Sequence, residues 1–445
     1  MQYNPPSPPT QSQELSRNSN EKIFMKQCTK ISSSTLKGEI YIPPSKSQTM
    51  RALVFALMSP SLSIIHNPLS SPDILAMVEA MRLLGARVDC YPNRMEVHGG
   101  LKPAEDVINC GNSGLVLRFI GALSSLLPTY TVLTGDSSIR HRRPALPLIE
   151  GINQLGGFAA SSRGDGHAPI IVRGTLKGGV ASISGEDSQP VSGLLIASSV
   201  VQGATEIFVQ NPGELPWVNL TLKWLDWFKI PYENRNFEHY RLKGGAQIPG
   251  FEYTVPGDWS SALYPIAAAL MTGSEITLHG IDFTDAQGDK EVVTLLQEMG
   301  AHITMQGRSL TVHRGGELKG TRIDIGKFID AITLLPVLAC IASGKTEIYN
   351  GAIARSKESD RIHAIVTQLQ KMGAKIVETI DGMIIEPSEL HGAQVTCFED
   401  HRMGLALSVA ACAAQGATEI VGTHVVGKSF PNYFESMRQL GVQIE

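Results

Sequence analysis

The stretch Pro43-Pro44-Ser45-Lys46-Ser47-Gln48-Thr49-Met50-Arg51 lies where a strand-like run, 38–42, gives way to an apolar run with helical spacing, 52–58. A helix N-terminus has free N–H groups and the positive end of the helix dipole, so it favours an anion. Lys46 and Arg51 add two positive charges to this turn. Taken alone, the stretch is more typical of a capped helix start with solvated charges. The chain, however, makes this kind of turn six times.

A second pattern recurs beside it: the end of an apolar helix, a glycine, and a short strand. Glycine at this point suits a helix C-cap in the left-handed conformation. The pattern returns at intervals of about 70 residues, which is typical of a repeated structural unit, and residues 224–230 form a sixth copy without the glycine. The five glycines are Gly85, Gly156, Gly300, Gly373 and Gly441.

Each copy also contains a strand-to-helix turn rich in Ser, Asn, Asp or Gly, and these residues are good N-caps. The helices that follow are apolar on nearly all sides, which predicts that they are buried. Buried helices with polar, charged N-termini would bring several positive dipole ends to one cleft. The six turns are 44–47, 110–114, 185–189, 256–261, 327–331 and 398–402.

The repeat predicts an α/β fold of six units, grouped three and three into two domains of ordinary size. We expect an N-terminal domain at 45–250, and a C-terminal domain made of 22–44 together with 251–445. Residues 1–21 are rich in Pro, Ser, Gln and Asn and lack the apolar core of a signal peptide, so we expect a disordered extension.

Composition excludes several classes of protein. Apolar residues make up 42% of the chain and charged residues 18%, as in ordinary soluble proteins. The net charge of −4 and the lack of a long basic block argue against nucleic acid as a partner. The six cysteines are dispersed, so neither a zinc site nor a disulfide framework is predicted. The dispersed cysteines fit a reducing, cytoplasmic setting best. No apolar run reaches membrane-spanning length.

The basic residues are concentrated in the turns and first helical turns. Singly, each is more typical of a solvated surface charge, but together in one cleft they would bind a substrate with several negative charges. Three acidic residues share these turns: Asp330, Glu358 and Asp400. Asp330 is interpreted either as an N-cap or as a general base. The seven basic residues are Lys46, Arg51, Arg118, Arg143, Arg361, Arg402 and Lys428.

Other catalytic signatures are missing from the sequence. It contains no Gly-x-Gly-x-x-Gly motif and no Walker lysine loop. Its Ser and His residues do not form a nucleophile elbow. The charged run 357–361 is also explained by salt bridges at a helix start.

Taken in order, the motifs resemble those of the 5-enolpyruvylshikimate-3-phosphate synthase family over residues 37–433. Each motif is weak alone, and the whole series in order is specific. The motifs are Pro44-Ser45-Lys46-Ser47 with Arg51, Gly111-Asn112-Ser113-Gly114 with Arg118, Arg143-Pro144, Asp187-Ser188-Gln189, Pro256-Gly257-Asp258-Trp259-Ser260-Ser261-Ala262, Gln287-Gly288-Asp289, Lys357-Glu358-Ser359-Asp360-Arg361-Ile362, Asp400-His401-Arg402-Met403 and Lys428-Ser429-Phe430-Pro431.

The resemblance implies a fold and a reaction. The fold is a two-domain inverse α/β barrel, three units per domain, with the helix N-termini facing the interdomain cleft. The reaction transfers the enolpyruvyl group of phosphoenolpyruvate to the 5-hydroxyl of shikimate 3-phosphate and releases phosphate. The family needs no metal or organic cofactor, and we expect a monomer.

The resemblance also implies roles for single residues. Asp330 would accept the hydroxyl proton, and Glu358, with Lys428 as a second candidate, would transfer a proton at the methylene carbon. Lys46 would touch both substrates, and Arg118 and Asp187 would lie at the binding site. Phosphoenolpyruvate is expected near Lys46, Gly114, Arg143, Gln189, Arg361, Arg402 and Lys428. Shikimate 3-phosphate is expected near Lys46, Ser47, Arg51, Ser188, Gln189, Asp330 and Lys357.

The sequence departs from the family pattern at several points. Leu115 stands where Thr is usual, and Asp187 stands where a phosphate-binding Ser is common. An anion at Asp187 would repel a phosphate unless Lys46 or Lys357 offsets it. The segment 213–217 is shorter than usual. The segment 137–143 is one residue longer, so Arg143 is preferred over Arg140 and Arg142 because Pro144 follows it.

Two other interpretations stay open at this point. The first is the sister family that transfers enolpyruvate to UDP-N-acetylglucosamine, which has Lys-Asn in its first motif and a loop cysteine as general acid. Here the first motif is Lys46-Ser47, and Cys110 precedes an Asn-Ser-Gly turn. The second is a repeat protein that binds anions without catalysis, although Asp330, Glu358 and Lys428 argue against it.

Overall fold

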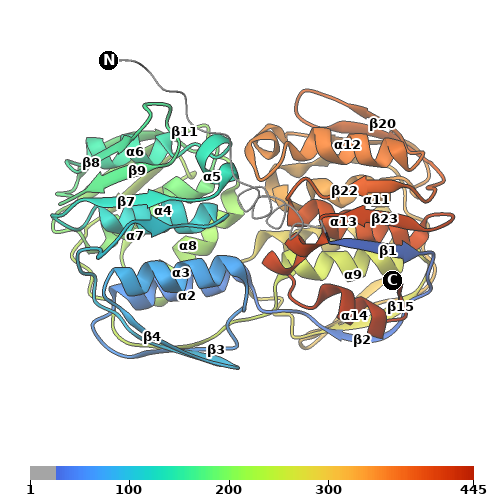
Figure 1. Cartoon of the computed structure of the whole chain (residues 1–445), viewed down its shortest axis with the longest axis horizontal. Coiled ribbons are helices and arrows are strands. Elements are labelled where there is room, and N and C mark those ends of the chain that lie inside the picture. Colours follow the sequence, from blue (N-terminus) through green and yellow to red (C-terminus); the bar gives the residue numbers. More distant parts are fainter. Residues whose placement is uncertain (1–26) are drawn as a thin grey trace, which may run out of the picture.

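The computed structural model describes residues 27–445, so the extension predicted at 1–21 lies outside the described residues. The prediction of a mixed α/β protein is confirmed. Buried apolar side chains form two hydrophobic cores, one from residues 50–255 and one from residues 31–42 and 259–442. The two bodies built on these cores lie side by side in Figure 1, blue to green for the first and mainly yellow to red for the second.

The strands form six four-stranded sheets with one shared pattern: a parallel pair at one edge, followed by two antiparallel pairings. In the first core the sheets are β14-β3-β5-β4, β6-β7-β9-β8 and β10-β11-β13-β12. Their strands are β3 (Ser63–His66), β4 (Arg87–Tyr91), β5 (Arg94–His98), β6 (Ile108–Asn109), β7 (Thr131–Thr134), β8 (Phe158–Ser161), β9 (Ile170–Arg173), β10 (Gly179–Ser184), β11 (Thr205–Gln210), β12 (Tyr232–Arg235), β13 (His239–Leu242) and β14 (Glu252–Thr254).

The second core repeats this arrangement with the sheets β16-β17-β15-β2, β18-β19-β21-β20 and β22-β23-β1-β24. Their strands are β1 (Cys28–Ser32), β2 (Lys37–Tyr41), β15 (Glu275–His279), β16 (Ile303–Gln306), β17 (Ser309–Val312), β18 (Arg322–Asp324), β19 (Thr346–Tyr349), β20 (Lys375–Glu378), β21 (Met383–Glu386), β22 (Gln394–Thr396), β23 (Thr418–Val421) and β24 (Gln443–Ile444).

Helices alternate with these strands. In the first core they are α2 (Lys46–Met58), α3 (Pro72–Leu83), α4 (Gly114–Ser124), α5 (Ser137–His141), α6 (Leu146–Gln154), α7 (Ser188–Val200) and α8 (Leu215–Trp227). In the second they are α9 (Trp259–Met271), α10 (Glu291–Met299), α11 (Leu335–Ala339), α12 (Arg361–Lys371), α13 (His401–Ala413) and α14 (Tyr433–Gln439). Short 3₁₀ segments are η1 (Gly288–Lys290), η2 (Ile325–Lys327), η3 (Ile329–Thr333), η4 (Ala352–Ser356) and η5 (Thr423–Lys428).

The chain passes between the two bodies twice. Near its start, β1 pairs with β23 and β24, and β2 pairs with β15, so these early strands complete sheets of the second core. On the return, β14 pairs with β3, and Phe251 and Val255 pack in the first core. Residues 251–255, predicted for the second domain, therefore pack with the first, because apolar side chains at 251 and 255 anchor the strand there.

The glycine of each repeat caps a helix, as predicted. Gly85, Gly156, Gly300, Gly373 and Gly441 all have positive φ, between 84° and 115°. In the sixth copy, Lys229 takes the same left-handed conformation, with φ of 56°. The backbone geometry of the unit is thus kept where the glycine is missing, at a conformational cost that glycine would not carry.

Five of the six predicted turns begin an α-helix with a side-chain N-cap. The caps accept hydrogen bonds from backbone N–H groups in the first turn. They are Ser45, Ser113, Asp187, Asp258 and Asp400.

The sixth turn differs, and the expectation of an apolar α-helix after Asp330 is wrong. Residues 325–333 form two 3₁₀ segments, and only the short α11 follows. Pro336 lies in the first turn of α11 and has no N–H to donate to the carbonyl of Ile332. The missing hydrogen bond and the bulk of the ring disfavour a continuous α-helix through that point. Asp330 is not an N-cap, since its side chain points instead to two arginines.

Candidate active site

Helix N-termini from both cores surround one cleft of about 220 Å³. The first residues of five helices line it: Lys46, Gly114, Ser188, Arg361 and His401. Each N-terminus offers unpaired N–H groups and a positive dipole end. The cleft is therefore built to attract small anions, and its volume suits metabolites rather than macromolecules.

All the residues predicted for the site lie around this cleft, and what each of them does stays a prediction. The interpretation of Arg143, rather than Arg140 or Arg142, agrees with the lining. The predicted residues in the lining are Lys46, Ser47, Arg51, Gly114, Arg118, Arg143, Asp187, Ser188, Gln189, Asp330, Lys357, Glu358, Arg361, Arg402 and Lys428.

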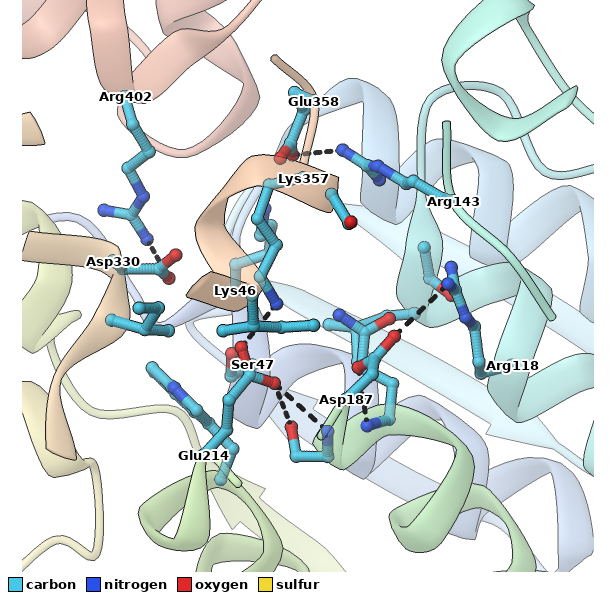
Figure 2. A pocket seen from close by; sticks show the side chains of 18 of the residues that line it. Lys46, Ser47, Arg118, Arg143, Asp187, Glu214, Asp330, Lys357, Glu358 and Arg402 are labelled. Carbon is cyan, nitrogen blue, oxygen red and sulfur yellow. Dashed lines mark hydrogen bonds and ion pairs between the residues drawn. The ribbon is translucent and has the colours of Figure 1, made fainter. Parts of the chain in front are cut away.

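Asp330 lies between two arginines, as Figure 2 shows for Arg402. One carboxylate oxygen accepts from Arg361 Nη1 and the other from Arg402 Nη2, both at 2.8 Å. Burial alone would raise the pKa of Asp330, but the charges of Arg402 and Arg361 hold it well below the ordinary value. Asp330 is therefore a carboxylate at neutral pH, ready to accept a proton but weakly basic while both arginines face it.

Glu358 is held by three cations from both cores. Its Oε1 contacts Arg143 Nη2 at 2.5 Å and Lys428 Nζ at 2.8 Å, and its Oε2 accepts from Arg361 Nη2 at 2.9 Å. Burial raises the pKa of this carboxyl, and the charges of Arg143, Lys428 and Arg361 lower it well below the ordinary value. Glu358 is thus ionised at neutral pH while these three cations face it.

Lys428 connects the two cores. Its ammonium donates to the carbonyl and the side-chain oxygen of Asn112, at 2.8 and 2.5 Å, besides contacting Glu358. Burial lowers the pKa of Lys428 despite the negative charges of Asp73 and Glu358. A lysine whose proton is loosened by burial, 2.8 Å from a carboxylate, is a suitable partner for proton transfer.

Lys46 pairs with Asp73, a residue that the sequence reasoning missed. Lys46 Nζ lies 3.3 Å from Asp73 Oδ2. Within residues 27–445, Lys46 forms no ion pair with Asp187. Asp73 is buried in the first turn of α3, after Ser71 and Pro72. The sequence Ser-Pro-Asp is itself a helix-start signal, and it would have marked this further N-terminus at the cleft.

The opposite end of the cleft also holds paired charges. Asp187 caps α7 by accepting from the N–H of Gln189, and lies 3.2 Å from Arg118 Nη2. Burial raises the pKa of Asp187, but Arg118 and Lys357 hold it below the ordinary value. Lys357 forms an ion pair with Glu214. The negative charge of Asp187 is therefore offset mainly by Arg118, whereas the sequence led us to expect Lys46 or Lys357.

Arg51 is buried without an ion-pair partner among the described residues. Burial lowers the pKa of its guanidinium to about 9. The group donates to Thr221 Oγ1 and to the carbonyls of Ser47 and Trp217, at 2.9, 3.1 and 2.9 Å. The charge of Asp285 offsets the effect of burial only in part. A buried cation at the edge of the cleft favours an anionic ligand.

Gly114 allows three polar groups to converge. A Cβ added there would lie 2.9 Å from Arg118 Nη1, 2.9 Å from Gln189 Oε1 and 3.2 Å from Arg143 Nη1. Several buried polar atoms of the lining have no hydrogen-bond partner in the described chain, among them Gln189 Oε1, Arg118 Nε, Arg143 Nε and Arg402 Nε. Buried polar groups are nearly always paired, so these atoms indicate a polar ligand.

His401 and Asp400 complete the site beneath the charged layer. Burial, followed by the charge of Lys46, lowers the pKa of His401 well below its ordinary value, so the ring is neutral. Asp400 accepts from Arg361 Nε at 2.9 Å and fixes its orientation. Within residues 27–445, no cluster of three or more His, Cys, Asp or Glu is arranged to hold a metal. No helix of the described chain is long and apolar enough to cross a membrane.

Comparison with known proteins points to one family. The profile of the EPSP synthase (3-phosphoshikimate 1-carboxyvinyltransferase) family matches residues 31–437. A 3-phosphoshikimate 1-carboxyvinyltransferase of Acetivibrio thermocellus is 41% identical over 418 residues, which cover 93% of this chain and 98% of the relative. Enzymes of the same name from Chlamydia caviae and Methanosarcina mazei are 39% and 41% identical, with coverage of 94% and 93% of this chain and 94% and 98% of theirs.

Solved structures agree with the sequence comparisons. An EPSP synthase from Acinetobacter baumannii superposes with a TM-score of 0.80 at 26% identity, and covers 94% of this chain and 99% of its own. A second structure of an EPSP synthase from that organism gives a TM-score of 0.78 at 25% identity, with the same coverage.

Proposed function

The chain belongs to the EPSP synthase family of 3-phosphoshikimate 1-carboxyvinyltransferases, and from this premise we propose how its cleft binds and converts the two substrates. The enzyme transfers the enolpyruvyl group of phosphoenolpyruvate to the 5-hydroxyl of shikimate 3-phosphate, with release of phosphate, in the shikimate pathway. The observation that carries the proposal is the position of Asp330, a carboxylate held between two arginines at 2.8 Å where helix N-termini converge.

Phosphoenolpyruvate binds at the end of the cleft that Glu358 occupies. Its phosphate and carboxylate engage Arg143, Arg361, Arg402 and Lys428, because arginine pairs with both groups in a bidentate manner. Gly114, Gln189 and Lys46 complete that end. The shikimate 3-phosphate binds toward Ser47, Arg51, Ser188 and Lys357, with Arg118 and Asp187 behind it and Lys46 shared between the substrates.

Binding of these anions changes the carboxylates that already occupy the cleft. A substrate phosphate or carboxylate shares the charge of Arg361 and Arg402, so those arginines depress the pKa of Asp330 less than before. Asp330 then becomes basic enough to take the proton of the 5-hydroxyl. By the same exchange, Arg143 and Lys428 release Glu358, whose pKa rises toward the range of a proton donor.

The steps balance as an addition followed by an elimination. The acceptor oxygen, losing its proton to Asp330, attacks the second carbon of phosphoenolpyruvate, while Glu358 or Lys428 protonates the methylene carbon. The tetrahedral adduct carries the phosphate, and the surrounding cations stabilise the charge that develops there. Phosphate then leaves with the electron pair of its C–O bond, and the group that protonated the methylene carbon takes back one methyl proton, which restores the double bond. The proton held by Asp330 passes to the released phosphate.

We further propose two domains of three units each, at about 45–255 and at 27–44 with 256–445, which close on the substrates in an inverse-barrel arrangement; residues 22–26 of the predicted second domain lie outside the described residues. In this structure the two cores contact each other through Arg143 with Glu358, Lys357 with Glu214, and Lys428 with Asn112, and bound substrates would take over the cations of the first two contacts. Closure excludes water, which competes for the activated enol ether. We propose that the enzyme acts as a monomer, in the cytoplasm and without nucleic acid, in keeping with its net charge of −4.

Phosphate release tests this function. The full chain is incubated with phosphoenolpyruvate and, in separate reactions, with shikimate 3-phosphate, shikimate or UDP-N-acetylglucosamine. Release is expected with shikimate 3-phosphate, and much less with shikimate. Release with UDP-N-acetylglucosamine alone would assign the chain to the sister reaction, and release with none of the acceptors would refute an enolpyruvyl transferase.

A further inference from the structure

Glu214 occupies the binding groups at one end of the cleft. It lies immediately before α8, and its side chain is only 3% exposed. Its Oε2 accepts from the N–H of Ser188 at 3.1 Å and from Ser188 Oγ at 2.8 Å, and its Oε1 pairs with Lys357 Nζ. Figure 2 shows this carboxylate turned toward the cleft, bonded to the start of α7.

These contacts are the ones that a bound anion would make. A helix N-terminal N–H, a hydroxyl and an ammonium together form a phosphate or carboxylate site. In the proposed function, Ser188 and Lys357 hold the acceptor. The carboxylate of Glu214 therefore stands where an anionic group of the acceptor would bind.

The backbone at Glu214 supports this reading. Its φ of 48° and ψ of 39° are left-handed, an uncommon conformation for a residue with a side chain. The contacts to Ser188 and Lys357 are the side-chain contacts of Glu214 in the described chain. A group that competes for both of them would free the side chain to turn away.

The charges around Glu214 make this one carboxylate important for the binding of an anion. The cleft is lined by eight Lys or Arg residues and seven Asp or Glu residues, so its positive excess is small. At this end Arg118 is already paired with Asp187, and Lys357 with Glu214. Arg51 alone faces the end without an ion-pair partner in residues 27–445.

We propose that Glu214 is a specificity-determining residue, which competes with the phosphate of the acceptor for Ser188 and Lys357. The inference rests on the proposed function, because that function assigns the acceptor to this end. It follows that Glu214 weakens the binding of a phosphorylated acceptor. It also reduces the difference in affinity between a phosphorylated acceptor and the same acceptor without its phosphate.

The variant E214Q tests the proposal. Glutamine keeps an oxygen to accept from Ser188 and keeps the side-chain length, but it removes the charge and releases Lys357. The matched control is E150Q, which removes an exposed carboxylate of α6 that does not line the cleft and has no side-chain contact to Ser188 or Lys357 in the described chain. Binding of shikimate 3-phosphate and of shikimate to each variant is measured by titration calorimetry, and KM for phosphoenolpyruvate by phosphate release.

We expect E214Q to bind shikimate 3-phosphate about tenfold more tightly than wild type, as for loss of one nearby like charge. Shikimate binding and KM for phosphoenolpyruvate should change less than about twofold, because neither reports on a phosphate at this end. E150Q should resemble wild type. Equal or weaker binding of shikimate 3-phosphate by E214Q than by wild type overturns the proposal. A rise in KM for both substrates together also overturns it, because Glu214 would then only connect the two cores.

Failure of the proposed function can be told apart from failure of the role assigned to Glu214. If the wild type releases no phosphate with shikimate 3-phosphate, the proposed function fails. Inorganic phosphate is then the probe: tighter binding by E214Q than by wild type supports the competition, and equal binding refutes it.

Discussion

Replacement of Asp330 by Asn removes the negative charge between Arg361 and Arg402 while keeping the shape of the side chain. The carboxylate accepts from each arginine at 2.8 Å. The amide can accept from only one of them, and it cannot take the proton of the acceptor hydroxyl. Since a positioned general base contributes roughly 10²–10⁴-fold to a rate, kcat should fall by about that factor.

Substrate binding should survive the same change. The substitution takes away an internal carboxylate that competes with phosphoenolpyruvate for the two guanidinium groups, so KM for phosphoenolpyruvate should stay level or fall. Arg361 keeps Asp400 and Glu358 as partners, whereas the side chain of Arg402 keeps no other ion pair in residues 27–445. Breaking a fully buried pair costs about 3–5 kcal/mol, and we expect less here because the Asp330 side chain is 24% exposed.

Steady-state phosphate release, with each substrate varied, separates kcat from KM, and thermal melting shows that the variant is folded. The matched control is Asp324→Asn. Residue 324 is the N-cap of η2, a role that asparagine can also fill, and it does not line the cleft. A kcat of Asp330→Asn within about threefold of wild type would remove Asp330 as the base. A large rise in KM with unchanged kcat would make it a binding residue only.

Three further changes test other parts of the structure. Gly114→Ala places a Cβ 2.9 Å from Arg118 Nη1 and Gln189 Oε1, so KM for phosphoenolpyruvate should rise several-fold with little change in Tm, and an unchanged KM would contradict that crowding. Burial, with the charge of Asp330, raises the pKa of Asp289 from 3.8 to about 7, so the stability that its protonation contributes is present below about pH 4 and is lost as the pH rises through 7. Asp289→Asn should therefore gain stability relative to wild type between pH 4 and pH 8, by at most about 4 kcal/mol. A difference in Tm between the variant and wild type that does not change with pH would contradict the raised pKa of Asp289. Lys229→Gly should stabilise the fold by about 0.5–1 kcal/mol by relieving a left-handed residue, whereas Lys223→Gly inside α8 should destabilise it by about 1 kcal/mol; equal denaturation midpoints for the two would refute the role of the cap.

The repeat could be predicted from the sequence because its signals are local. A left-handed cap favours glycine for steric reasons, so Gly85 and its four counterparts mark one helix end in five of the six units. Lys229 shows the limit of that rule, since a residue that does not favour this conformation adopts it in the sixth unit. The N-caps Ser45, Ser113 and Asp400 were likewise visible as short polar residues before apolar runs.

The pairing of charges could not be predicted in the same way. Lys46 meets Asp73 rather than Asp187, and Lys357 meets Glu214, because these contacts depend on how separate units face one another across the cleft. Sequence patterns report which residues begin helices, but not which opposing N-terminus each one faces. The 3₁₀ geometry around Asp330 was missed for a simpler reason, since Pro336 was passed over as a helix breaker.

The most direct test of the central claim identifies the products of the full chain with phosphoenolpyruvate and shikimate 3-phosphate by mass spectrometry. Our account predicts that phosphoenolpyruvate is consumed, and that phosphate and the enolpyruvyl ether of the acceptor appear in equal amounts. Phosphate without the ether would mean that the cleft hydrolyses its substrate instead of transferring the enolpyruvyl group, and would contradict the account.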